Sequence, residues 1–117
     1  MKYYETFEEL KNCIGKVIYF YYTENGKKDG KIKYAWAKQI TELKKNIRDN
    51  SIIDVMVYGI NGVVFDEGKE KKIPKFSYKH ETISNAQQFA RELTLNEKLI
   101  YRILIKQFEK KEKITQK

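Results

Sequence analysis

Hydrophobic and polar residues alternate along the first two thirds of the chain in the way expected of β-strands. Residues 16–23 are rich in β-branched and aromatic side chains, which favour a strand. In residues 31–40, Ile32, Tyr34, Trp36 and Ile40 share one face, and lysines, alanines and a glutamine occupy the other. This pattern predicts a half-buried strand, and the Asn25-Gly26 pair predicts a hairpin turn before it.

Shorter apolar runs continue the strand pattern through the middle of the chain. Strands are expected at 52–58, 63–65 and 72–78, with a turn at the G-x-x-G sequence of residues 59–62 between the first two. Pro74 places the last of these strands at a sheet edge, because proline donates no backbone hydrogen bond. Residues 41–51 are polar and fit either a short helix or a strand that ends near Arg48.

Capping boxes mark three helix starts. Thr6-x-x-Glu9 opens a short helix that Gly15 can terminate, and Thr94-x-x-Glu97 opens the last helix. A third box, residues 84–87, precedes apolar residues at the i, i+3, i+4 and i+7 spacing of an amphipathic helix: Ala86, Phe89, Ala90 and Leu93.

Strands followed by helices predict an α+β fold. We expect a single domain over residues 1–117, with a short N-terminal helix and an antiparallel sheet of about five or six strands within residues 1–79. Residues 82–112 are expected to form a pair of C-terminal helices, and residues 113–117 a frayed tail.

The last helix combines a basic stripe with a broad apolar surface. The basic residues recur every four positions: Lys98, Arg102, Lys106 and Lys110. Most of the remaining circumference is apolar: Leu99, Ile100, Ile103, Leu104, Ile105 and Phe108. A helix that is apolar over so much of its surface is normally packed between two neighbours, so we expect self-association.

Composition points toward an anionic partner. The chain has 24 basic and 16 acidic residues and a formal net charge of +8, which suits nucleic acid, a nucleotide, a membrane surface or an acidic protein. Scattered lysines are also simply solvated surface in many proteins. Cys13 is the only cysteine, and neither a secretion signal nor a membrane-spanning run is present, so we expect a soluble cytoplasmic protein.

Residues for catalysis are sparse. His80 is the only histidine, which leaves metal clusters and most acid–base pairs without members. A Cys13–His80 pair would resemble a nucleophile and its base, but a buried thiol and a surface imidazole are the favoured explanation of these residues. No phosphate-binding P-loop or dinucleotide fingerprint occurs, and we expect neither an enzyme nor a cofactor.

Five residues are candidates for recognising an anion. Arg102 offers a planar fork for phosphate, and Lys106 lies one turn further along the same helix. Asn85 follows the predicted cap at Ser84 and is free to contact a base or a ribose. Phe76 is a candidate for stacking on adenine, with core packing as its alternative. Arg48 is a further candidate cation, or only a surface charge.

In outline the chain resembles the first-described family of phage Thoeris anti-defence sponge proteins. The resemblance rests on a sheet followed by helices and on the places of Phe76, Asn85, Arg48, Arg102 and Lys106. It implies a homo-oligomer built from dimers that binds and sequesters a cyclic ADP-ribose isomer without destroying it. The family pattern has an arginine where this chain has Lys106.

Two other functions remain open at this point. A basic nucleic-acid-binding or regulatory protein would explain the charge and the tyrosine-rich strands. A protein-binding inhibitor of a host defence complex is a further alternative, although many such inhibitors are acidic.

Overall fold

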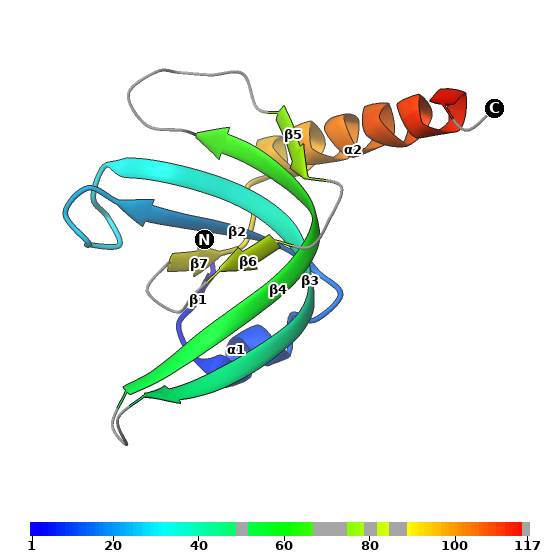
Figure 1. The fold of residues 1–117 in the computed structure, drawn as a ribbon. Coiled ribbons are helices and arrows are strands. Elements are labelled where there is room, and N and C mark those ends of the chain that lie inside the picture. Colours follow the sequence, from blue (N-terminus) through cyan, green and yellow to red (C-terminus); the bar gives the residue numbers. More distant parts are fainter. Residues whose placement is uncertain (49–51, 67–74, 79–81, 85–88, 116–117) are drawn as a thin grey trace.

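The computed structural model describes residues 1–48, 52–66, 75–78, 82–84 and 89–115. In these residues the chain forms a short helix, a strongly curved antiparallel sheet and a long C-terminal helix (Figure 1). The predicted α+β class, the antiparallel sheet and the short N-terminal helix are therefore confirmed.

The sheet contains seven strands within the described residues. Their order is β1-β7-β2-β3-β4-β5, and β6 pairs with β4 beside this path. The strands are β1 (Tyr3–Tyr4), β2 (Val17–Thr23), β3 (Ile32–Arg48), β4 (Ile52–Asp66), β5 (Lys75–Tyr78), β6 (Thr82–Ser84) and β7 (Phe89–Arg91). The helices are α1 (Phe7–Lys11) and α2 (Leu95–Thr115). Strand β5 lies at a sheet edge, as the proline before it predicts.

Strands β3 and β4 are longer than the sequence pattern indicates. The ambiguous segment up to Arg48 continues β3, and β4 runs unbroken through residues 59–62, so the predicted turn there is wrong. The register between the strands shifts beside these residues, and Asn61 adopts a left-handed φ of 56°. A β-bulge thus accommodates the extra residue, and the strand bends instead of reversing.

The helix predicted from residue 84 onward is also wrong, so the expected pair of C-terminal helices is one helix. Residues Thr82–Ser84 and Phe89–Arg91 are strands, and the intervening residues lie outside those described. Strand β7 pairs with both β1 and β2. Ala90 joins the apolar cluster on one sheet face and Phe89 the cluster on the other, as strand alternation requires. Local helical spacing is overridden here by backbone pairing to two neighbouring strands.

Each face of the sheet carries an apolar cluster. On the side of α1, Phe20 and Trp36 stack with ring centroids 6.0 Å apart, and Cys13, Ile18 and Ile40 pack around them. On the side of α2 the cluster contains Tyr19, Tyr21, Ala35, Ala37 and Leu93. Layers on both faces explain why so many aromatic residues are buried in a small sheet.

One charged side chain lies inside the first cluster. Lys38 has no exposed surface; its Nζ donates a hydrogen bond to the Val57 carbonyl and lies 5.2 Å from the Phe20 ring centroid. Its alkyl chain passes over Gly59, where a Cβ atom would approach Lys38 Cδ to 2.7 Å. Burial lowers the pKa of Lys38 to about 7.

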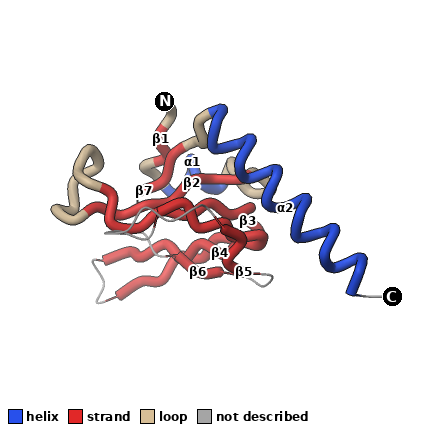
Figure 2. The backbone as a smooth tube through the Cα atoms, turned by 90° about the horizontal axis from the view of Figure 1, so that it is seen from above, coloured by secondary structure: helices blue, strands red, loops and turns tan. Residues whose placement is uncertain are grey.

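Helix α2 begins where its capping box predicts and continues to Thr115, past residue 112 where the sequence predicts fraying. Its C-terminal half extends beyond the sheet in both views (Figures 1 and 2). Leu95, Leu99 and Ile103 are 76%, 48% and 55% exposed. The single chain therefore covers only one side of this broadly apolar helix.

Candidate anion-binding groove

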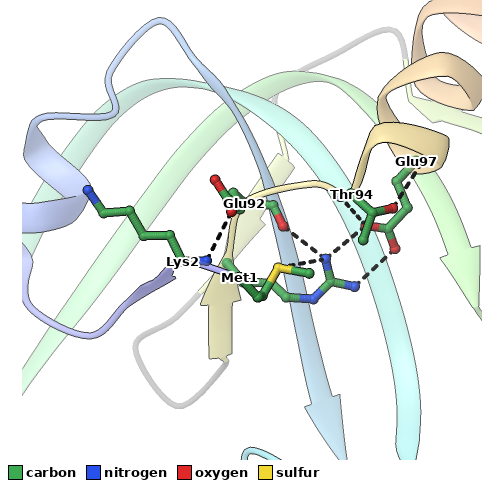
Figure 3. A network of polar contacts seen from close by, with 6 residues as sticks. Met1, Lys2, Glu92, Thr94 and Glu97 are labelled. Atoms are coloured by element: carbon green, nitrogen blue, oxygen red, sulfur yellow. Dashed lines mark hydrogen bonds and ion pairs between the residues drawn. The ribbon is translucent and has the colours of Figure 1, made fainter.

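The start of α2 is held by a polar network (Figure 3). The Glu97 N–H donates to Thr94 Oγ1, and the Thr94 N–H donates to Glu97 Oε1 at 2.8 Å, which completes the predicted capping box. Arg91 of β7 donates two hydrogen bonds to the same carboxylate, at 2.8 and 2.9 Å. Its guanidinium also stacks on the Tyr19 ring at 3.7 Å. The helix is thereby fixed to the sheet at its first turn.

The N-terminal segment closes the same corner. The Lys2 N–H donates to Glu92 Oε1, and the Glu92 N–H donates to the Lys2 carbonyl. Strand β1 pairs with β7 directly after this contact, which brings Tyr4 beside the start of β2. Residues from both ends of the chain thus meet at the base of α2.

A cavity of about 630 Å³ lies between α2 and this corner of the sheet. We call it the α2 groove. Its helix side is formed by Lys98, Tyr101, Arg102, Ile105, Lys106 and Glu109, and its sheet side by Tyr4, Lys16, Val17, Ile18, Glu92 and Leu93.

Three of the four residues in the predicted basic stripe line the groove, and Lys110 does not. Each four-residue step moves about 40° around a helix, so Lys110 is displaced about 120° from Lys98. Glu109 is displaced only about 20° and therefore occupies the end of the groove-facing surface instead.

The groove is lined by four basic side chains and two carboxylates, so its lining is net positive. Lys16, Lys98, Arg102 and Lys106 are all exposed side chains on its lining. In the part of the chain that the structure describes, none of them forms an ion pair with a carboxylate. The excess of cations over the two carboxylates, Glu92 and Glu109, creates a field that attracts a compact anion.

Aromatic and acidic residues complete the lining. Tyr101 donates its hydroxyl hydrogen to the Asn61 carbonyl at 2.9 Å, and burial raises its pKa to about 12. Burial likewise raises the pKa of Tyr4, with a further increase from the neighbouring Cys13. Glu92 and Glu109 are acceptors for hydroxyl or amine donors.

The predicted site residues are only partly brought together. Arg102 and Lys106 lie side by side in the groove. Phe76 lies in β5 opposite Val63, and Arg48 ends β3 opposite Ile52. The side chains of Phe76 and Arg48, and all of Asn85, lie outside the described residues. Figure 1 places the end of β3 across the molecule from α2.

Sequence reasoning missed the sheet side of the groove. Lys16, Tyr4 and Glu92 are far apart in the chain and meet only because β7 inserts between β1 and β2. The segment that forms β7 was expected to be helical, so no signal in the sequence pattern pointed to this pairing.

Cys13 is buried, and its thiol donates to the Glu9 carbonyl at 3.3 Å, while His80 lies outside the described residues. No group of metal-binding side chains occurs in the described part of the chain. None of the described helices has the length and apolarity needed to span a membrane.

Comparison of the chain with protein-family models, with curated proteins and with solved structures gives no match.

Proposed function

We propose that this protein binds and sequesters a compact nucleotide of the cyclic ADP-ribose type. The observation that carries the proposal is the α2 groove, where Lys98, Arg102 and Lys106 line a cavity of about 630 Å³. This volume is in the range of small-molecule sites, which are usually about 300–1,000 Å³. The outline resemblance to phage Thoeris anti-defence sponges supports the same ligand class.

The groove chemistry suits the parts of such a nucleotide. Arg102 offers two parallel N–H donors to a phosphate, and Lys106, about 6 Å further along the helix axis, reaches the next phosphate. Tyr4 and Tyr101 supply aromatic surface for a base, and Glu109 accepts hydrogen bonds from ribose hydroxyls. The ligand is held without bond cleavage, in the cytoplasm of the infected bacterium where the host produces such signals.

In this proposal the protein blocks host defence only by binding the signal, as mass action requires. A sponge that binds the signal lowers its free concentration and leaves the host effector of Thoeris immunity without its activator. No turnover is required, so the ligand is released intact when the protein is denatured.

The proposed protein acts as a homodimer or larger oligomer. Leu95, Leu99 and Ile103 form an exposed apolar strip along α2, next to the basic residues. A second copy would cover this strip, and Ile103→Asp would then shift the mass measured by light scattering to that of a monomer. A monomeric wild-type protein at tens of micromolar would contradict this part of the proposal.

The test is calorimetric titration with cyclic ADP-ribose isomers. We expect micromolar or tighter binding by the wild type and a loss of at least tenfold for Arg102→Ala, because a charge-assisted phosphate contact contributes about 1.5–3 kcal/mol. Lys110→Ala is the matched control, since Lys110 is an exposed cation of the same helix that lies outside the groove. Equal effects of the two substitutions, or no binding by the wild type, would refute the proposal.

Nucleic-acid binding is the competing function, favoured by the net charge of +8. It predicts that Arg102→Ala and Lys110→Ala weaken binding to an oligonucleotide alike, with affinity that falls steeply as salt rises. Glu92 and Glu109 in the groove disfavour a polyphosphate backbone there. A gel shift at low salt, with the same two variants, separates the two functions.

A further inference from the structure

The α2 groove has a second cationic wall, formed by Lys16 at the entrance to β2. This residue lines the same cavity as Arg102 and Lys106 but comes from the sheet side. Its exposed side chain has no ion-pair partner among the described residues.

The backbone at Lys16 is fixed on both sides. The Lys16 N–H donates to the Cys13 carbonyl at 2.9 Å, and the Lys16 carbonyl accepts from the Ile40 N–H at 3.0 Å. The preceding Gly15 has a φ of +90°, donates to the Ile40 carbonyl, and accepts from the Gln39 side chain. The backbone that carries the cation is therefore already held in place, so ligand binding orders only the lysine side chain.

Cations on two opposite sides of a groove favour a diphosphate over a monophosphate. A single phosphate group is fully contacted by the Arg102 fork and its neighbour on the helix side. A diphosphate carries additional charged oxygens, and some of them remain directed away from the helix when it is bound there. A cation on the opposite wall reaches those oxygens.

We propose that Lys16 contacts phosphate across the groove and makes the site selective for diphosphate-bearing ligands over monophosphates. The inference rests on the proposed function and adds a residue from the sheet to the phosphate site. It predicts that loss of the Lys16 charge weakens diphosphate ligands and leaves monophosphates almost unaffected.

The experiment compares Lys16→Met with wild type by calorimetry against four probes: cyclic ADP-ribose, inorganic pyrophosphate, adenosine monophosphate and orthophosphate. We expect affinity for the first two to fall about 10- to 20-fold, which is the lower part of the range for a charge-assisted contact because Lys16 is solvated. Affinity for the two monophosphate probes should change less than about twofold. Lys16→Arg, which keeps the charge, should restore most of the diphosphate affinity.

Lys27→Met is the matched control, because Lys27 is an exposed lysine in the loop between β2 and β3, outside the groove. Equal losses for Lys16→Met and Lys27→Met would indicate a general charge effect and overturn the inference. Unchanged diphosphate binding by Lys16→Met, alongside a loss for Arg102→Ala, would overturn it while leaving the proposed function in place. Failure of the wild type to bind any of the four probes would overturn both. Thermal denaturation of each variant confirms that the fold is retained.

Discussion

Replacement of Arg91 by methionine tests how α2 is held in place. The guanidinium donates two hydrogen bonds to Glu97 and one to the Glu92 carbonyl, at 2.8 to 2.9 Å. The two side chains of the ion pair are only 11% and 17% exposed. Methionine keeps an unbranched apolar side chain but removes the guanidinium that stacks on the Tyr19 ring, and it leaves the Glu97 carboxylate without its cation.

The expected cost is about 2–3 kcal/mol of unfolding free energy. Breaking a fully buried pair costs about 3–5 kcal/mol, and the lower figure applies here because Glu97 keeps its hydrogen bond from the Thr94 N–H and some solvent. For a domain of this size, that loss lowers the melting temperature by about 10 °C. Chemical denaturation followed by far-UV circular dichroism measures it directly.

A double-mutant cycle with Glu97→Gln isolates the pair from its surroundings. We expect a coupling energy of at least about 1 kcal/mol between Arg91 and Glu97. A loss below about 0.5 kcal/mol for Arg91→Met, or a coupling energy near zero, would refute the view that this pair anchors the helix.

The same pair predicts acid sensitivity. Burial raises the pKa of Glu97, but hydrogen bonds from Arg91 and Thr94 lower it more strongly, so the net pKa lies below its usual range. The stabilisation is therefore complete above about pH 4.3 and is lost as the pH falls through the folded-state pKa. Arg91→Met should reduce this acid-dependent loss, which urea titrations at pH 3 to 6 can measure.

The remaining predictions concern the interior of the sheet. Because burial lowers the pKa of Lys38 to about 7, the unfolded chain binds more protons than the native one above that pH, and stability should rise by about 1.4 kcal/mol per unit between pH 7 and 9. Lys38→Met should abolish this rise, which urea titrations at several pH values measure. An unchanged dependence of stability on pH would contradict the lowered pKa of Lys38. Gly59→Ala should destabilise by about 1–3 kcal/mol, because its Cβ would approach the Gln39 carbonyl oxygen to 2.7 Å; a neutral effect in chemical denaturation would show that the backbone yields easily. Tyr101→Phe should cost about 1 kcal/mol through loss of the hydroxyl contact to the Asn61 carbonyl, and a change of less than about 0.3 kcal/mol in the same assay would count against that contact.

Local signals in the sequence were sufficient where the structure depends on neighbouring residues. The Thr94 capping box forms as predicted, because it bonds groups only three residues apart. At the first helix Thr6 caps the Glu9 N–H as predicted, but the Glu9 carboxylate accepts from the Thr6 hydroxyl and the Glu5 N–H. The strand at β2 follows from its β-branched and aromatic composition. The basic stripe of α2 was likewise readable, since helical periodicity alone determines which side chains share a face.

Other features depended on which strands became neighbours, and no local pattern contains that information. The segment at β7 has helical spacing but pairs with β1 and β2, because backbone hydrogen bonding to two strands outweighs a weak local preference. Residues 59–62 resemble a turn, yet they bend within β4 through a bulge opposite β3.

The sequence by itself determined that α2 carries a line of positive charge, because about 3.6 residues per turn suffice to place Lys98, Arg102 and Lys106 on one side. Only the tertiary structure decided that this side faces a cavity and that Lys16 stands on the opposite wall. Those outcomes required β7 to join β1 to β2 and the Arg91–Glu97 pair to fix the direction of the helix, and such contacts between distant segments form only when the whole sheet assembles.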